Sequence, residues 1–294
     1  MMSYDFQTTT HGKWILAGEH AVLRGHAAIV FPINEMQLTL SYNKSPPELS
    51  ADYTGISGED MHLLFWSVLE QGIQLLGQSL NHMTGQFHLQ SNIPVGVGVG
   101  ASAALCVAMA RWFAAYDMLP HREIQPFARQ LENLFHGKSS GLDIAGVAAA
   151  SGVYFKQGVC SEIKLAWQPQ WYLSSCKQIG MTSHCIKQVQ TLWLNDEEHA
   201  KKIDLEMNDS VTQARAALEQ ASPTAQHLLT QAINSAADCF KQWGLVSASL
   251  QVHMQHLLEA GALAVKPTGS GGGGYVVSLW GSTPPEMGVE LIAI

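Results

Sequence analysis

The sequence predicts an α+β fold in two halves. Between residues 12 and 157, apolar and alternating strand patterns are interleaved with runs of helical spacing. From about residue 158, two short strands precede four long helical stretches, and the chain then returns to strands. The 294 residues, 47% hydrophobic and 14% charged, are enough for two globular domains. We therefore predict domains at residues 1–157 and 158–294.

Elements of the first half are predicted from periodicity and from the turns between them. Two-residue alternation or a short apolar run predicts a strand, and spacing of three and four predicts a helix. Turn-forming residues at Asn43–Pro47 and a polar break at His136–Gly141 separate some of these elements. The predicted strands are Lys13–Ala17, Ala27–Ile33, Met36–Tyr42, Gly85–Ser91 and Gly152–Phe155, and the predicted helices are Met61–Leu76, Ala101–Tyr116, Ile124–Phe135 and Leu142–Ala150.

The second half shows the same two spacings, alternation for strands and three or four residues for helices, and it contains no internal repeat. Its predicted strands are Glu162–Trp167, Trp171–Ser174, Ala262–Val265 and Tyr275–Leu279, and its predicted helices are Ile186–Trp193, Glu197–Gln220, Thr224–Trp243 and Ser247–Glu259.

Composition and charge argue against several classes of protein. The net charge of −8 does not indicate a basic face that would bind nucleic acid. The longest apolar run, Ala101 to Ala110, is shorter than the roughly 20 residues that span a bilayer. The first residues lack a signal-peptide pattern. Five scattered cysteines without a CxxC pair favour reduced thiols, and we therefore expect a cytoplasmic protein without a membrane partner.

The stretch GKWILAGEHAVLRG, residues 12–25, places Lys13 at the start of a buried strand. A buried lysine without a partner is costly, so Lys13 should face a cleft or meet a carboxylate. From these residues alone, a structural ion pair and a functional lysine both remain open.

The stretch IPVGVGVGASAA, residues 93–104, puts three glycines directly before a predicted helix. Glycines let the backbone approach a ligand, and a helix N-terminus presents unpaired N–H groups, which together suit a phosphate. The pattern is neither a Walker A loop nor GxGxxG. A flexible strand–helix turn is the alternative, and Ser102 favours a phosphate or a metal.

Two further stretches carry residues suited to chemistry. KPTGSGGGG, residues 266–274, is longer than a structural turn between two strands requires, so it favours a loop that wraps a ligand. In ENLFHGKSSGLD, residues 132–143, Glu132 lies near the end of one predicted helix and Asp143 begins the next helical run. An ordinary helix cap at Asp143 and a solvated Glu132 are the alternatives.

These four stretches, in this order, resemble the GHMP kinase superfamily and, within it, the mevalonate kinase family. GKWILAGEHAVLRG is similar to the first motif of that family, PVGVGVGASAA to its phosphate-binding motif P-x-G-x-G-L-G-S-S-A-A, HGKSSGLD to H-G-N-P-S-G-x-D, and KPTGSGGGG to K-x-T-G-A-G-G-G-G. The resemblance runs from residue 12 to about 280, and the stretch from about 160 to 260 carries no motif that we can align.

The resemblance implies an enzyme that uses ATP and Mg²⁺ to phosphorylate the 5-hydroxyl of mevalonate, in isoprenoid biosynthesis. It also implies an N-terminal domain like ribosomal protein S5 domain 2 and a ferredoxin-like C-terminal domain. Homodimers are common among such relatives. Two alternatives stay open: another GHMP kinase acting on phosphomevalonate or a different hydroxyl substrate, and a non-catalytic ATP-binding sensor on the same fold.

The resemblance also assigns roles residue by residue. Asp143 matches the catalytic aspartate and Lys13 the lysine beside it. Glu132 matches the magnesium-binding glutamate and Ser102 the serine that contacts magnesium and phosphate. Glu19 and His20 match the substrate end, and Thr268, Gly269 and Ser270 begin the loop that closes the site. The expected ATP-binding residues are Ser91, Gly96, Val97, Gly98, Val99, Gly100, Ala101 and Ser102.

Some residues depart from the pattern of the family. Ala101 replaces the first serine of the phosphate motif, Val99 its leucine, and Ser270 an alanine. Lys138 and Ser139 replace Asn-Pro, and a lysine there could favour an anionic substrate or pair with Glu132. None of these changes removes a catalytic group.

Overall fold

The computed structural model describes residues 4–137 and 139–294, and contacts divide the chain into two units. Unit 1 is built from Met1–Lys13, Pro32–Val95 and Val99–Ala150. Unit 2 is built from Trp14–Phe31, Gly96–Gly98 and Ser151–Ile294. Both units are discontinuous in sequence, because two long N-terminal strands each contribute residues to both. The continuous domains predicted at 1–157 and 158–294 remain a prediction.

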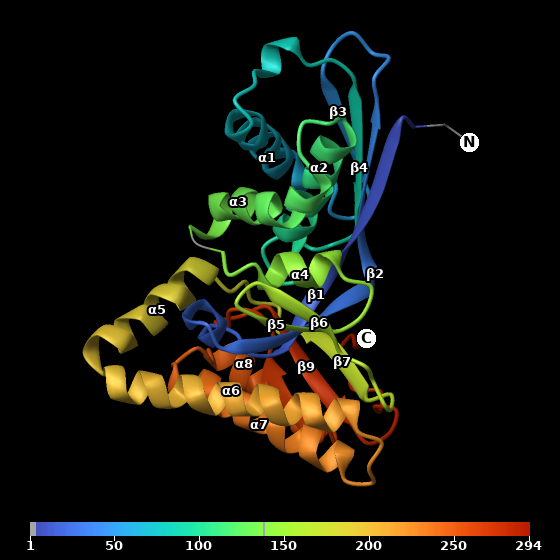
Figure 1. The fold of residues 1–294 in the computed structure, drawn as a ribbon. Coiled ribbons are helices and arrows are strands. Elements are labelled where there is room, and N and C mark those ends of the chain that lie inside the picture. Colours follow the sequence, from blue (N-terminus) through green and yellow to red (C-terminus); the bar gives the residue numbers. More distant parts are fainter. Residues whose placement is uncertain (1–3, 138) are drawn as a thin grey trace. The chain divides into compact units, whose positions relative to one another are not determined.

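Unit 1 combines a mixed sheet with four helices (Figure 1). The last residues of strand β2 (Ala27–Asn43) pair antiparallel with β4 (Gln86–Ser91), and β3 (Ser50–Thr54) pairs parallel with β4. Helices α1, α2 and α3 lie on one side of β3 and β4 (Figure 1). Strand β1 (Phe6–Ala17) pairs with β2. The helices are α1 (Met61–Leu75), α2 (Ala101–Ala115), α3 (Ile124–His136), α4 (Leu142–Ala148) and the short 3₁₀ helices η2 (Leu80–His82) and η3 (His121–Glu123).

Helix α2 forms the centre of unit 1. Twelve of its fifteen residues are buried, and it contacts α1, α3 and α4. A helix that is apolar on all sides is stable only inside a core, and the small alanines of α2 let neighbouring helices approach closely. The position of its N-terminus is therefore determined by packing on every side.

Unit 2 contains an antiparallel sheet in the order β10-β7-β9-β8 and a smaller β-structure. In the latter, the first residues of β2 pair with β5 (Val153–Lys156), which pairs with β6 (Val159–Glu162). The strands of the sheet are β7 (Gln170–Ser175), β8 (Ala264–Pro267), β9 (Tyr275–Trp280) and β10 (Ile292–Ala293), and the helices are η1 (Ala21–Arg24), α5 (Thr182–Asn195), α6 (Glu197–Glu219), α7 (Ala225–Gln242) and α8 (Ala248–Glu259).

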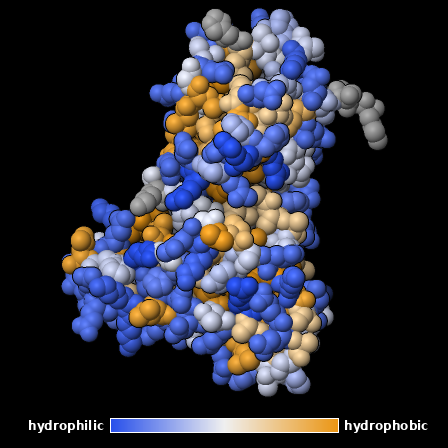
Figure 2. Space-filling view, in the orientation of Figure 1, coloured by the Kyte–Doolittle hydropathy of each residue, from blue (hydrophilic) through white to orange (hydrophobic). Residues whose placement is uncertain are grey.

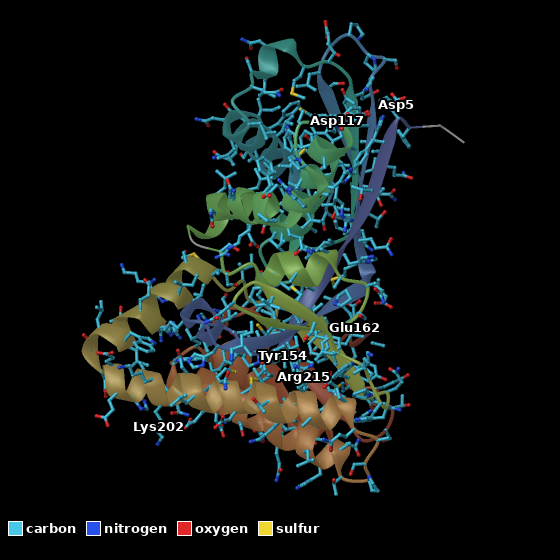
Figure 3. The ribbon with its side chains drawn as sticks, viewed as in Figure 1. Asp5, Asp117, Tyr154, Glu162, Lys202 and Arg215 are labelled. Atoms are coloured by element: carbon cyan, nitrogen blue, oxygen red, sulfur yellow. The ribbon has the colours of Figure 1, made fainter. Side chains whose placement is uncertain are left out.

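Helix α6 has one buried face and one hydrophilic face, and it contacts strand β5. Its buried residues follow the spacing of one helix face, and hydrophilic residues predominate over it on the face shown in Figure 2. From α6, Arg215 stacks on Tyr154 of β5, with its guanidinium carbon 4.4 Å from the ring centroid (Figure 3). Arg215 also bonds Glu219 one turn further on. The contact with Tyr154 attaches α6 to the β5–β6 hairpin, and the bond to Glu219 lies within α6.

Most predicted elements are present, and the differences have local causes. The strand predicted at Glu162–Trp167 is wrong, because Gln157 and Gly158 form a two-residue turn with positive φ and the returning strand begins directly after it, at Val159. The two strands predicted between residues 27 and 42 are one continuous strand that changes partner from β5 to β4. Helix α5 begins at Thr182 rather than Ile186. Strands β3 and β10 were not predicted, since their sequences alternate weakly.

Candidate active site

Lys13 and Asp143 form a buried ion pair in unit 1. The Nζ atom of Lys13 lies 2.9 Å from Oδ1 of Asp143. The lysine side chain is only 2% exposed, whereas that of Asp143 is 30% exposed. The N-cap residue of α4 is Gly141 and Asp143 lies inside the first turn, so Asp143 is not the capping residue of this helix. The buried lysine thus has a carboxylate partner, and that carboxylate remains open to a second molecule.

The end of the glycine stretch lies against Lys13. The N–H of Lys13 donates to the carbonyl of Val99 (2.8 Å). Gly100 precedes α2 with φ +89°, and a Cβ built on it would lie 2.8 Å from Cγ of Lys13 and 3.0 Å from Cγ1 of Val147. A side chain at this position would displace the lysine, so glycine is required both by the backbone and by the close approach.

The N-terminus of α2 is free of side-chain caps. Gly100 at the N-cap has no side chain to accept from the first N–H groups, and the first turn contains no acidic residue. The helix therefore presents unpaired donors and the positive end of its dipole next to the Lys13 ammonium. Ser102 lies in this first turn and is half-buried. This arrangement suits an anion.

Glu132 is buried near the end of α3, with 1% of its surface exposed, so the alternative of a solvated glutamate is wrong. Its Oε2 accepts a hydrogen bond from the Ser139 hydroxyl, whereas its buried Oε1 has no hydrogen-bond partner among the described residues. Burial, and then the Asp143 charge, raise the pKa of Glu132 to about 8, against the opposing effects of Ser139, Lys13 and Arg129. The site therefore favours a cation beside this carboxylate.

The oxygen donors of unit 1 fit Mg²⁺ better than a softer metal. No group of three or more His, Cys, Asp or Glu side chains in the described part of the chain is arranged to hold a metal. Magnesium does not need such a group, because it keeps several waters and takes only one or two protein carboxylates together with phosphate oxygens. The orphaned Oε1 of Glu132 is an oxygen donor of the type that Mg²⁺ prefers, so the residues present fit this ion.

In unit 2, Glu19 pairs with Lys266 in a fully buried position. Nζ of Lys266 lies 2.5 Å from Oε1 of Glu19 and also donates to the carbonyls of Pro267 (2.6 Å) and Ile15 (3.2 Å). Neither side chain is more than 2% exposed. A buried lysine with a carboxylate and two carbonyls as acceptors is well compensated, and it holds Glu19 in one orientation.

His20 is buried in unit 2 and has an unusual backbone. It has φ 51° and ψ −49°, a conformation rarely adopted by residues with a side chain, and its ring packs against Phe240 and Trp243. Its Nε2 lies 2.8 Å from the Ser270 carbonyl, which can only accept, so Nε2 carries the hydrogen. Burial lowers the pKa of His20 to about 4. The ring is therefore neutral at pH 7, and Nδ1 is a hydrogen-bond acceptor.

The loop after β8 is connected to two other predicted site segments of unit 2. Its Thr268 hydroxyl accepts from the N–H of Ile15 (2.7 Å) and donates to the Ile15 carbonyl (3.1 Å). A Cβ on Gly274 would lie 2.7 Å from the Val97 carbonyl, and one on Gly269 would lie 3.4 Å from the Gly98 carbonyl. Thr268, Gly269 and Ser270 thus lie with Gly96–Gly98 and with His20.

Arg24, which is partly exposed, and the buried Asp204 form a third ion pair that the sequence did not indicate. The guanidinium contacts both carboxylate oxygens, with Nη2 2.6 Å from Oδ1, and it also lies over the ring of Trp193. Asp204 is 1% exposed on the buried face of α6. An aspartate on the helix face that also carries Ile203 and Met207 could have indicated a buried charge. The sequence around it does not indicate which residue is its partner.

The structure brings the predicted site residues together in two groups. Unit 1 holds Lys13, Glu132, Asp143 and the segment Val99–Ser102, and unit 2 holds Glu19, His20, Gly96–Gly98 and Thr268–Ser270. Ser91 ends β4, where its hydroxyl accepts from the N–H of Ile93 in its own turn. Lys138 lies outside the described residues. Ser139 and Lys266 were noted in the motifs but given no role.

Comparison with known proteins supports the family that the motifs indicate. Residues 64–152 match the family described as GHMP kinases N terminal domain. The chain is 26% identical to a mevalonate kinase of Aeropyrum pernix, an alignment that covers 96% of this chain and 90% of that protein. It is 37% identical to a mevalonate kinase of Archaeoglobus fulgidus over 134 residues, which are 45% of this chain and 46% of that protein.

The fold is also similar to that of a solved structure. The crystal structure of Leishmania major mevalonate kinase in complex with R-mevalonate has a TM-score of 0.79 and 24% sequence identity, and it covers 96% of this chain and 91% of its own. This similarity confirms the predicted two-domain α+β fold class. No helix in the described residues is long and apolar enough to cross a membrane.

Proposed function

Because the chain belongs to the GHMP kinase family and is an ATP-dependent small-molecule kinase, we propose that it transfers the γ-phosphoryl group of ATP to the 5-hydroxyl of mevalonate. The observation that carries this proposal is the Lys13–Asp143 pair beside the uncapped N-terminus of α2. The relatives named mevalonate kinase support the choice of substrate, since similarity to them extends over nearly the whole chain. The product would enter isoprenoid biosynthesis.

Asp143 is proposed to orient the attacking hydroxyl and to accept its proton. It is the exposed member of the ion pair, so a substrate hydroxyl can approach it. Lys13 remains buried behind it and offsets negative charge that develops at the reacting oxygens. Phosphoryl transfer needs positioning and charge neutralisation more than covalent chemistry, and this pair provides both.

The N-terminus of α2 is proposed to bind ATP phosphates. The glycine stretch from Gly96 to Gly100, with positive φ at each of its three glycines, exposes backbone N–H groups that suit phosphate oxygens. Ser91, Val97, Val99 and Ala101 are proposed as neighbours of the nucleotide on the resemblance alone.

Glu132 and Ser102 are proposed to hold Mg²⁺. When bound, the ion would neutralise charge on the phosphates of ATP. The buried, orphaned Oε1 of Glu132 supports this assignment, and Ser102 offers a hydroxyl at the same helix end where phosphates are expected.

Glu19 and His20 are proposed to bind the substrate, with Thr268, Gly269 and Ser270 completing that part of the site. The neutral His20 ring offers Nδ1 as an acceptor for a hydroxyl, and Lys266 holds Glu19 in a single orientation. A cytoplasmic location and a homodimer remain predictions from the sequence and the resemblance.

The test is Mg²⁺- and ATP-dependent ADP release with mevalonate, phosphomevalonate, homoserine and galactose as alternative substrates. We expect kcat/KM to be highest for mevalonate. A higher value for another compound would retain the kinase and overturn the substrate. ATP binding without turnover on any of the four would instead favour the non-catalytic sensor.

A further inference from the structure

The two carboxylate oxygens of Glu132 have different surroundings. Oε2 accepts a hydrogen bond from the hydroxyl of Ser139, which is itself only 6% exposed. Oε1 is equally buried, yet it has no hydrogen-bond partner among the described residues. A buried acceptor without a partner is costly, so Oε1 is the oxygen of Glu132 that a ligand would stabilise.

The direction of the Ser139 hydroxyl is determined by its other bond. Its oxygen accepts from the N–H of Gly141 (3.0 Å), so its hydrogen is left for Glu132. Oε2 of Glu132 is the oxygen that receives this hydrogen. In the ionised form, which a bound cation favours, both carboxylate oxygens can only accept.

Helix α3 itself fixes the backbone of Ser139. The N–H of Ser139 donates to Oδ1 of Asn133 (2.8 Å), and its carbonyl accepts from Nε of Arg129 (2.9 Å). Arg129, Glu132 and Asn133 are spaced by three and four residues, so they lie on one face of α3. The backbone of Ser139 is therefore hydrogen-bonded to the same face of α3 that carries Glu132.

We propose that Ser139 is a positioning residue that holds Glu132 as a one-oxygen ligand for Mg²⁺ in the nucleotide complex. With Oε2 engaged by the hydroxyl, only Oε1 is available to the ion, which is the binding mode that the octahedral geometry of Mg²⁺ favours. In metal sites, hydrogen bonds from residues that do not touch the ion orient the carboxylates that bind it. The inference rests on the proposed kinase function, since that function requires Mg²⁺ and ATP.

A merely structural role for Ser139 would have a different consequence. If the hydroxyl only stabilised the turn before α4, its loss would lower thermal stability and leave the metal dependence of nucleotide binding unchanged. Ser140 provides a matched control in the same turn, because its hydroxyl accepts from the N–H of Leu142 (3.1 Å) and makes no recorded bond to Glu132.

The test measures binding without turnover. Calorimetric titration with the β,γ-imido analogue of ATP, once with Mg²⁺ and once with EDTA, gives the factor by which Mg²⁺ tightens nucleotide binding. We expect Ser139→Ala to reduce this factor about tenfold or more, as loss of such an orienting hydrogen bond does in other metal sites, with affinity in EDTA unchanged. Ser139→Thr should restore the factor, and Ser140→Ala should retain that of the wild type.

A double-substitution cycle separates positioning from stability. In a Glu132→Gln background, Ser139→Ala should cause no further loss of the Mg²⁺ factor, because the ligand that it positions is already gone. Melting temperatures of all variants report folding separately. If Ser139→Ala does not fold, Ser139→Cys carries the test, because a thiol of similar size is only a weak donor to Glu132 and should also reduce the Mg²⁺ factor.

Three results would overturn the inference: an unchanged Mg²⁺ factor in Ser139→Ala, an equal loss in Ser140→Ala, or an additive effect in the Glu132→Gln background. Turnover on mevalonate by the wild type is measured in parallel. Binding that follows the expected pattern without mevalonate turnover would overturn the substrate proposal and leave the role of Ser139 standing.

Discussion

Asp143 and Lys13 differ in exposure, and this difference assigns their roles at the scale of single residues. The lysine is almost fully buried and serves as a fixed charge, whereas the carboxylate is open enough to meet a hydroxyl. The two residues therefore have different roles that depend on their exposure. A substitution at Asp143 should therefore affect the chemical step and also folding, since it leaves the buried Lys13 without its charge partner, whereas a substitution at Lys13 leaves a carboxylate that water can reach.

Replacing Asp143 with asparagine should lower kcat by about 10²–10⁴-fold, the usual contribution of a general base. The affinity for the imido analogue of ATP should change little, because Asp143 is not proposed to contact the nucleotide. Steady-state kinetics and calorimetry check the two parts. Near-normal turnover would remove Asp143 from the mechanism.

His20 should make the stability of the protein depend on pH. Its pKa in the folded chain is about 4, below the ordinary value of 6.5, so the unfolded chain binds the proton more tightly. The stability contributed by neutral His20 is therefore complete above pH 6.5 and is lost as the pH falls through about 4. Arg24 and Asp204 are the charged groups that act on this ring, and their effects oppose each other.

Urea unfolding between pH 4 and pH 7 measures this dependence. The free energy of unfolding should fall toward pH 4 in the wild type, and the His20→Gln variant should show a shallower fall. An identical slope in both proteins would show that His20 does not cause the effect.

At the scale of elements, the start of α2 is where the sequence was most informative. Glycines before an alanine-rich helix predicted a phosphate site, and the structure leaves that helix end uncapped and next to a lysine. The pairing of β6 and the continuity of β2 were less predictable. They depend on which strands become partners, and local alternation does not contain that information.

Substitution of Gly100 by alanine should impair both folding and catalysis. The positive φ would cost about 1–3 kcal/mol for a residue with a side chain, and the new Cβ would displace Lys13. Gly77→Ala is the matched control, because it also has positive φ (+67°) but no atom lies within 4 Å of its Cβ. Both variants should lose stability in urea unfolding, and only Gly100→Ala should lose kcat. An equal loss of kcat would contradict the role of this contact.

For the whole molecule, the motifs predicted which residues form the site but not every contact that holds them. Lys13 is distant in sequence from Glu132 and Asp143, and only the family resemblance placed all three in one site. The Lys266–Glu19 and Arg24–Asp204 pairs join residues 247 and 180 positions apart. Such contacts depend on the complete fold, so no local pattern could identify them. Ser139 was visible as a departure from the motif, but its partner became apparent only in the structure.

Binding of nucleotide should stabilise the molecule. At a concentration 100 times its Kd, the imido analogue of ATP should raise the free energy of unfolding by about 2.7 kcal/mol. At a fixed analogue concentration, the rise in the free energy of unfolding of the wild type should be larger with Mg²⁺ than with EDTA. The Glu132→Gln variant should lose most of that difference. Thermal melts check this. An unchanged Mg²⁺ effect in Glu132→Gln would mean that the metal is held elsewhere.

Transfer of the γ-phosphoryl group of ATP to mevalonate at Asp143 is the function proposed for this chain, and release of ADP alone does not distinguish this transfer from hydrolysis of ATP. The most direct measurement is therefore the transfer of ³²P from γ-labelled ATP, with the wild type and Asp143→Asn assayed side by side. We predict that the label released from ATP is recovered in phosphorylated mevalonate with the wild type and is almost absent from it with the variant. Label recovered as inorganic phosphate, or equal transfer by both proteins, would contradict the account.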